Sequence, residues 1–74
     1  MNGSGTGTAS ARSAVVHGAR SLREVRAYLP RNYTARQEQD GTIVVEGTDV
    51  AGWGLDTYVI PRLASGSMRA EEVA

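Results

Sequence analysis

The chain of 74 residues contains no cysteine, no phenylalanine and no lysine. Without cysteine it can form neither a disulfide framework nor a thiolate metal site. One Trp and three Tyr are the only aromatic residues, so few large side chains are available to fill a core. A chain of this length forms a single domain, and domains below about 80 residues often gain stability by self-association. We therefore expect one small domain for which a homo-oligomer, most simply a homodimer, is a candidate state.

Long hydrophobic runs are missing as well. No apolar run approaches the roughly 20 residues that span a bilayer. The N-terminus has no basic region leading into a hydrophobic one. The sequence therefore predicts a soluble, cytoplasmic protein without a membrane partner.

Net charge is zero, but the charges are unevenly distributed along the chain. Residues 12–36 hold six arginines and the single acid Glu24, whereas residues 37–74 hold seven acids and two arginines. Such an asymmetry can produce a basic binding face. It is equally compatible with two halves that fold against each other, or with protomers that dock head to tail.

The first third of the chain predicts a tail, an extended segment and a helix. Residues 1–13 are rich in Gly, Ser and Thr, which is typical of a flexible tail, so we place the domain at residues 14–74. The segment 13–20 predicts an edge strand or an extended lead-in. Next, a capping box begins a helix: the Ser21 hydroxyl accepts from the third helical N–H, and the Glu24 carboxylate accepts from the cap's own N–H. Apolar residues then recur at helical spacing over residues 22–29, and Pro30 ends the run.

The clearest strand signal is a pair of alternating segments, residues 33–38 and 42–46, around a turn that ends in Gly41. A two-residue turn would mix charged side chains into the apolar face. A three-residue loop with Gly41 in a left-handed G1 bulge instead gives one coherent apolar face, and we predict this loop. Its cross-strand pairs are Gln37 with Ile43 and Ala35 with Val45, and its buried face consists of Tyr33, Ala35, Ile43 and Val45.

The densest apolar stretch, residues 51–66, holds the only Trp and is expected to centre the core. Apolar side chains at helical spacing from Leu55 onward predict a helix with Gly66 just after its end. Pro61 lies past the first turn of this helix and predicts a kink. The alternative is a third strand over residues 57–60, which their β-branched and aromatic side chains favour.

These predictions combine into an α+β fold. A flexible N-terminal tail precedes a short helix, a β-hairpin and a second, kinked helix that packs on the apolar face of the hairpin. Residues 67–73 are expected to add only a short, frayed turn.

Three segments carry a resemblance to small uncharacterised proteins of actinobacteria and their phages. They are Tyr28-Leu29-Pro30-Arg31-Asn32-Tyr33, Asp40-Gly41-Thr42 and, above all, the run from Ala51 to Gly66 that contains Gly-Trp-x-Leu-Asp-x-Tyr-Val-Ile-Pro-Arg-Leu. The resemblance covers about residues 22–73. It implies a short accessory protein of a bacterium or phage and brings no catalytic residue with it.

Few residues are candidates for chemistry. His17 is the only imidazole, so it cannot build a zinc site of the usual kind, and an exposed tail histidine is the simpler interpretation. Asp49 and Asp56 could form a pair of catalytic carboxylates, but helix caps explain both positions. No nucleophile stands beside a base in any recognisable motif. We therefore expect no enzymatic activity, no cofactor and no metal site.

Two sets of residues are candidates for binding. The first is a basic cluster suited to phosphate contacts, with Tyr28 and Tyr33 interleaved: Arg20, Arg23, Arg26, Arg31 and Arg36. A solvated helix face, with Arg20 paired to Glu24, is the simpler account of it, and the sequence pI of about 6.5 is low for a nucleic-acid-binding domain. The second set comprises residue types enriched at protein interfaces, namely Trp53, Tyr58 and Arg62. The alternative for Trp53 and Tyr58 is a place in the small core.

The leading functional hypothesis is a non-enzymatic protein-interaction or accessory module that binds a protein partner or itself. A small nucleic-acid-binding regulator with an Arg-rich first helix is the second hypothesis. A third is a folded fragment whose role depends on a larger complex.

Overall fold

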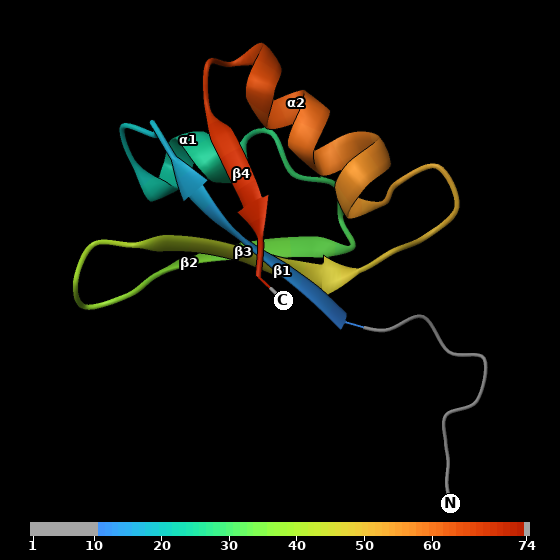
Figure 1. Ribbon diagram of the computed structural model, residues 1–74, viewed down its shortest axis with the longest axis horizontal. Helices are drawn as coiled ribbons and strands as arrows, with labels where there is room; N and C mark the ends of the chain where they lie inside the picture. The colour runs from blue at the N-terminus through green and yellow to red at the C-terminus, as the bar shows by residue number, and fades with distance from the viewer. Residues whose placement is uncertain (1–10, 74) are drawn as a thin grey trace, which may run out of the picture.

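The computed structural model describes residues 11–73. Its elements, in chain order, are β1 (Ala11–His17), α1 (Leu22–Arg26), β2 (Tyr33–Gln37), β3 (Ile43–Thr48), the π-helical turn η2 (Leu55–Val59), α2 (Ile60–Ser65) and β4 (Arg69–Glu72). The four strands form one sheet in the order β2-β3-β1-β4, with every neighbouring pair antiparallel. The helices lie on one face of this sheet (Figure 1). The predicted α+β class is confirmed.

Strand β1 is the largest departure from the sequence-based expectation. It pairs with β3 on one side and β4 on the other, so it is an interior strand and not an edge strand. It also begins at Ala11, which means that residues 11–13 are wrongly assigned to the flexible tail. Their own composition predicts no strand, and only pairing with β3 brings them into the sheet. The remainder of the predicted tail, residues 1–10, lies outside the described residues.

The hairpin of β2 and β3 is confirmed in detail. Gln37 pairs with Ile43, and Ala35 pairs with Val45. The loop is closed by hydrogen bonds from Glu38 N to Thr42 O at 2.8 Å and from Gly41 N to Glu38 O at 2.9 Å. Gly41 has a φ of 92°, as the predicted G1 bulge requires. The four residues predicted for the buried face are all buried.

Helix α1 begins where the capping box predicts but is shorter than expected. Ser21 Oγ accepts a hydrogen bond from Glu24 N at 3.1 Å, whereas the Glu24 carboxylate accepts from Arg20 N at 2.7 Å and not from Ser21 N. The regular helix ends at Arg26 instead of Leu29. Tighter hydrogen bonds, from Tyr28 N to Val25 O and from Leu29 N to Arg26 O, carry the chain toward Pro30.

A helix over the predicted residues is confirmed, formed by η2 and α2, and the alternative strand over residues 57–60 is wrong. The α2 part packs chiefly on β4 and not, as expected, on the hairpin strands. Val59 N donates to Gly54 O at 3.0 Å, and Ile60 N donates to Leu55 O, so the first turn has i→i−5 hydrogen bonds. Pro61 follows this wide turn and lies in the first turn of α2, where a missing N–H costs least. The π-helical turn thus accommodates the proline that predicts the kink.

The end of α2 and the segment after it correct two further predictions. The left-handed residue is Ser67, with a φ of 69°, and not Gly66, which has a φ of −99°. Met68 N donates to Leu63 O and Ser67 N to Ala64 O, both at 3.0 Å, which is a Schellman closure. The chain then forms β4, so residues 67–73 are not merely a frayed turn. Pairing with β1 stabilises this charged strand, which its own residues do not predict.

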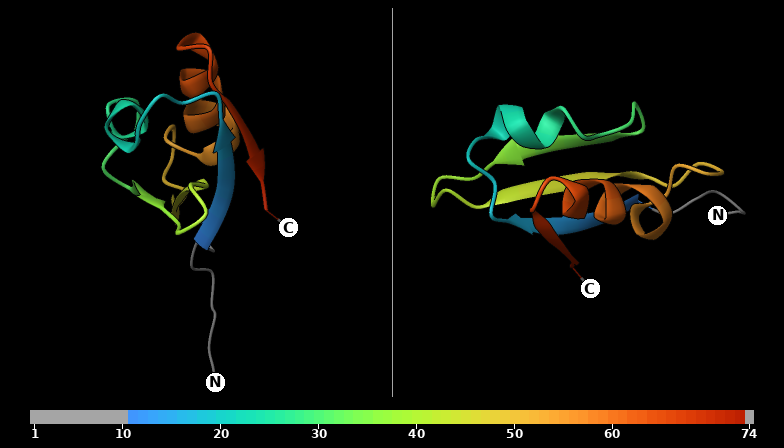
Figure 2. Two further views of the ribbon diagram at one scale, coloured as in Figure 1. Left: turned by 90° about the vertical axis from the view of Figure 1, so that its left-hand side faces the viewer. Right: turned by 90° about the horizontal axis from the view of Figure 1, so that it is seen from above.

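The core lies between the sheet and the helix layer (Figure 2). Its buried residues come from every element and the loop before β4: Ala14, Val16, Val25, Tyr33, Ala35, Ile43, Val45, Leu55, Val59, Leu63, Met68 and Ala70. Leu55, Val59 and Leu63 are fully buried, so the central stretch does supply core residues as expected. On the opposite face of the sheet, Val44 is also buried, and the strand register sets it opposite Val15 and Arg36.

No helix in residues 11–73 has the length and apolar character that a membrane crossing requires.

Candidate functional site

The loop between β3 and η2 forms a tight turn that presents Trp53. Trp53 N donates to Val50 O at 2.7 Å, and Val50 and Trp53 form an isolated antiparallel bridge. Gly52, inside the turn, has a φ of 81°, a conformation that side chains other than glycine rarely adopt. At the other end of the turn, Asn32 Nδ2 donates to Thr48 O at 2.8 Å and to Trp53 O at 2.7 Å. The backbone of Trp53 is therefore held from two directions.

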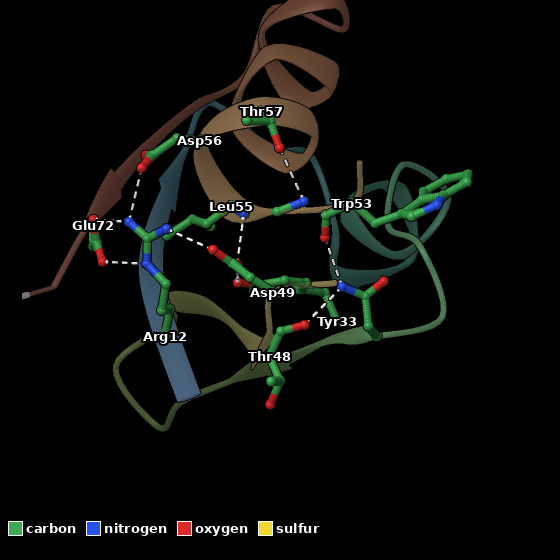
Figure 3. A network of polar contacts seen from close by, with 11 residues as sticks. Arg12, Tyr33, Thr48, Asp49, Trp53, Leu55, Asp56, Thr57 and Glu72 are labelled. Atoms are coloured by element: carbon green, nitrogen blue, oxygen red, sulfur yellow. Dashed lines mark hydrogen bonds and ion pairs between the residues drawn. The ribbon is translucent and has the colours of Figure 1, made fainter. Parts of the chain in front are cut away.

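The Trp53 side chain does not fill the core, so that alternative is wrong for Trp53, whereas the partly buried Tyr58 does pack against the core. The residue is 46% exposed, and its ring lies against the half-buried Tyr58, with ring centroids 4.7 Å apart and planes tilted by 47°. Smaller side chains from η2 and α2, chiefly Leu55, Val59 and Leu63, occupy the core instead. The indole projects away from the polar contacts below the helix (Figure 3).

Trp53 and Tyr58 line a shallow cavity of about 530 Å³ between the start of η2 and the segment after α1. Its walls are mostly apolar and are formed by Leu29, Pro30, Arg31, Asn32, Val50, Trp53 and Tyr58. We call this cavity the Trp53 groove. Val50, at 52%, is as exposed as Trp53, so the groove presents two large apolar residues to solvent.

Arg62 lies beside the groove, one helical turn after Tyr58. Its guanidinium carbon is 5.7 Å from the centroid of the Tyr28 ring, within the range of a cation–π contact. A Cβ on Gly66 would come within 2.5 Å of the Tyr28 hydroxyl, so this glycine leaves room for the ring. The predicted interface set of Trp53, Tyr58 and Arg62 is thus gathered on one side of the molecule.

The predicted basic cluster is divided between the two sides of the sheet. Arg36 lies on the face away from the helices and forms ion pairs with Glu46 at 2.5 Å and with Glu38 at 3.4 Å. Arg26 donates to the Ala35 carbonyl at 3.3 Å and so covers the outer edge of β2. Arg20 forms no ion pair with Glu24, whose carboxylate accepts from the Arg20 backbone instead.

Within residues 11–73, five arginines have no carboxylate within ion-pair distance, and all five lie on or beside the helices: Arg20, Arg23, Arg26, Arg31 and Arg62. The other three are each paired with acids. Glu24 and Asp56, the latter paired with Arg12, are the only acids in this layer, and every other acid of the chain lies in the strands or their loops. The helix layer is therefore positive and the remainder of the molecule negative.

Arg12 organises the largest polar cluster (Figure 3). Its guanidinium pairs with Asp49 at 2.9 Å, with Asp56 at 2.9 Å and with Glu72 at 2.5 Å. The hydrogen bonds that Arg12 donates, that to Glu72 above all, raise the pKa of Arg12. One residue thereby connects β1, the loop after β3, η2 and β4. Sequence reasoning missed it because Arg12 stands in an apparent tail, and no local signal reveals its three partners.

Asp49 fixes the start of η2 below the groove. Its Oδ1 accepts from the Tyr33 hydroxyl at 2.6 Å and from Leu55 N at 3.0 Å, so its predicted capping role is confirmed. The hydrogen bond from Tyr33, followed by that from Arg12, lowers the pKa of Asp49. Burial, then the hydrogen bond to Asp49, raises the pKa of Tyr33 to about 12. Gly54 N is satisfied separately, by Thr57 Oγ1 at 3.1 Å.

The remaining candidates for chemistry are separated from the groove. Asp56 does not cap the helix; its carboxylate contacts Arg12, which lies between it and Asp49. His17, at the end of β1, is exposed, with Nε2 3.6 Å from Glu71. Among residues 11–73, no three His, Cys, Asp or Glu side chains are grouped so as to hold a metal ion.

Comparison of the chain with protein-family models, with curated proteins and with solved structures gives no match. The resemblance to actinobacterial and phage proteins therefore stays a prediction.

Proposed function

We propose that this chain is a non-enzymatic protein-interaction module, and that the Trp53 groove binds an apolar segment of an acidic partner protein. The observation that carries the proposal is the exposed Trp53, held by its backbone and stacked on Tyr58 at the wall of an apolar groove. The only Trp of the chain would be expected to fill the core, but it lies outside the core. Binding a partner would remove its exposed surface from water.

The residue types in and around the groove support this function. Trp, Tyr and Arg are the side chains most often found to dominate the energy of protein interfaces. Tyr58 and Trp53 provide rigid apolar surface. Arg31 lines the groove, and Arg62 lies one helical turn after Tyr58. A partner segment that places an aliphatic or aromatic side chain in the groove would meet these arginines with its flanking residues.

The charge distribution indicates the character of the partner. The five arginines without carboxylate partners, including Arg23, Arg31 and Arg62, make the helix layer positive. Complementary charge raises association rates and excludes wrongly charged partners. An acidic segment with apolar anchors fits this layer better than a neutral or basic one.

Selection from a random peptide library displayed on phage tests the proposal. We expect enrichment of peptides in which Asp or Glu flank an aromatic or aliphatic residue. Trp53→Ala should weaken the binding of these peptides about tenfold or more, as for a hot-spot residue. Arg36→Ala is the matched control, because Arg36 lies on the other face of the sheet. Peptides that bind Trp53→Ala as tightly as the wild type would contradict the proposal.

Nucleic-acid binding is the second candidate function, because Arg20, Arg23 and Arg31 also lack carboxylate partners and could contact phosphates. Arg26 is engaged with the Ala35 carbonyl and Arg36 with Glu46, so the full predicted cluster does not form one surface. Fluorescence anisotropy with labelled single- and double-stranded oligonucleotides distinguishes the two functions. Salt-sensitive binding that is lost on charge reversal at Arg23 and Arg31, but retained by Trp53→Ala, would favour this candidate.

A further inference from the structure

The outer edge of β4 is open. Strand β4 ends the sheet on one side, and no described element covers its outer side (Figure 2). At the opposite edge, β2 is shielded by α1, with Arg26 hydrogen-bonded to the Ala35 carbonyl. Uncovered edges present unpaired N–H and C=O groups to which another strand can pair. The two edges of this sheet are therefore not equivalent.

The register of β4 on β1 shows which backbone groups are free. Val73 N donates to Ser13 O at 2.9 Å, and antiparallel ladders alternate, so Arg69 and Glu71 also direct their backbone groups toward β1. The N–H and C=O groups of Ala70 and Glu72 therefore point outward. Met68, immediately before the strand, already uses its N–H in a hydrogen bond to Leu63 O.

We propose that β4 pairs antiparallel with β4 of a second copy of this chain, on a two-fold axis at Ala70, to form a homodimer with one continuous eight-stranded sheet. The inference is independent of the Trp53 groove, which lies elsewhere on the molecule. Two-fold dimers are the commonest form of oligomer, and addition of a strand to a sheet edge is a recurrent mode of protein binding.

Charge complementarity selects this register. Side chains opposite each other must lie on the same face of the sheet, so the two-fold axis passes through a residue and not between two residues. The residues at the middle of β4, where two copies overlap most, are Ala70 and Glu71. The axis at Glu71 sets Glu71 directly opposite Glu71 of the partner subunit. The axis at Ala70 sets Arg69 opposite Glu71 of the partner subunit, and does so twice. These pairs are not hydrogen-bonded through the backbone, so their side chains approach closely.

The charges of β4 are free to make these contacts. Arg69 and Glu71 are 72% and 63% exposed at their side chains. Within one chain they lie 3.7 Å apart, and Glu71 lies 3.6 Å from His17 Nε2; both contacts are exposed and therefore weak. Glu72, on the other face, is held by Arg12 and does not take part. Charged side chains on an edge strand usually oppose association. Here the opposite charges of Arg69 and Glu71 complement themselves across a two-fold axis.

Helix α2 provides apolar surface above the same edge. It packs on β4, and Arg62 marks the flank of the helix that faces Tyr28. At about 100° per residue, Ile60 and Ala64 lie on the opposite flank. Figure 2 shows α2 next to β4 with α1 on its other side, so the flank that faces away from Tyr28 is the one nearer to β4. The two-fold axis would bring both copies of this flank together, which adds apolar burial to a domain with a small core.

Sedimentation equilibrium with charge-swapped variants tests the proposal. We expect a wild-type dimer that weakens with added salt. Arg69→Glu sets Glu opposite Glu71 of the partner subunit, and Glu71→Arg sets Arg opposite Arg69, so each variant alone should dimerise at least about tenfold more weakly. A mixture of the two variants restores every complementary pair, and we expect a heterodimer of near wild-type affinity. The double variant with both substitutions should likewise dimerise.

Arg23→Glu on α1 is the matched control, because it makes the same change of charge on the side of the fold away from β4. It should leave the dimer unchanged. A wild-type protein that is monomeric at its highest soluble concentration would overturn the proposal. So would single variants that dimerise as well as the wild type, which would point to another interface, or a mixture that associates no better than its components. Circular dichroism of each single variant shows whether it is still folded, so that loss of the dimer can be distinguished from unfolding.

Discussion

The hydroxyl of Tyr33 donates a 2.6 Å hydrogen bond to Asp49, whose same oxygen accepts from the backbone N–H of Leu55 at 3.0 Å. A buried residue of β2 thus positions the first residue of η2 through one carboxylate. Trp53 lies two residues before Leu55 in the sequence, and Tyr58 lies three residues after it. The shape of the Trp53 groove therefore depends on a polar contact at the border of the core.

Tyr33→Phe should lower the free energy of unfolding by about 1–2 kcal/mol, because it removes this hydrogen bond and leaves Asp49 with one donor fewer. The pH dependence should also change. The pKa of Tyr33 is raised from 10.0 to about 12, first by burial and then by its bond to Asp49. Its contribution to stability is complete below pH 10 and is lost as the pH rises through the folded-state pKa of about 12.

Urea unfolding measured at several pH values between neutrality and pH 12 checks this prediction. The wild-type protein should lose stability over the alkaline window, and Tyr33→Phe should show a shallower decline there. In the folded wild type, absorbance at the tyrosinate band should contain a late-titrating component that the variant lacks. Identical alkaline profiles for the two proteins would contradict the assignment.

Asp49→Asn should flatten the acid side of the stability profile. The hydrogen bond from Tyr33, then that from Arg12, lowers the pKa of Asp49 below 3.8. A carboxyl with a lowered folded-state pKa contributes stability above its unfolded pKa, and this contribution is lost as the pH falls through the folded-state value. The variant has no such group to protonate, and its amide N–H₂ faces the Arg12 guanidinium.

Asp56→Asn is the control for this substitution. Asp56 also contacts Arg12, but its side chain is 63% exposed and it accepts neither from Tyr33 nor from Leu55. Thermal unfolding between pH 2 and pH 7 should show a larger loss for Asp49→Asn than for Asp56→Asn near neutrality. Equal losses would mean that contact with Arg12 alone explains the role of Asp49.

Gly47→Ala should be among the most destabilising single-methyl substitutions in the chain. A Cβ at Gly47 would lie 2.1 Å from the Asn32 carbonyl oxygen and 2.8 Å from Tyr33 Cα, and backbone atoms cannot move away without disturbing the β2 and β3 pairing. We expect a loss of about 2 kcal/mol or more, measured by urea unfolding. Gly41→Ala is an informative comparison, because a Cβ there meets nothing within 4 Å and only the φ of 92° opposes it. A smaller loss for Gly47→Ala than for Gly41→Ala would contradict this account.

The segments that sequence alone predicts correctly are those whose signals are local. The hairpin register follows from alternation and from Gly41, and the start of α1 follows from Ser21, because the deciding contacts lie within a few residues. Strand β4 lacks such signals and becomes a strand only through its pairing with β1. For β1, the segment 13–20 predicts an edge strand or an extended lead-in, but only the pairing with β3 and β4 makes it an interior strand that begins at Ala11. The role of Arg12 also has no local signal, because its acidic partners are 37 to 60 residues away in sequence.

The candidate binding residues could not be placed from the sequence alone either. Composition indicates that Trp53, Tyr58 and Arg62 are suited to an interface, but it equally predicts that the only Trp fills the core. The choice depends on whether smaller side chains can fill the space, and Leu55, Val59 and Leu63 do so. Similarly, the closeness of six arginines in sequence does not show that they share one surface: the alternation of side chains along β2 places Arg36 on the far face of the sheet.

Trp53→Ala should separate binding from folding. Truncation of a buried Leu costs about 2–5 kcal/mol, so Leu63→Ala, at a fully buried position, should destabilise the domain severely. Trp53 is 46% exposed, and its loss removes the Tyr58 contact but opens no enclosed cavity, so we expect a cost near 1 kcal/mol. Urea unfolding of the two variants, followed by circular dichroism, gives both values. If Trp53→Ala lowers the free energy of unfolding as much as Leu63→Ala does, the indole mainly stabilises the fold. The exposed Trp53 would then no longer support a binding role for the Trp53 groove.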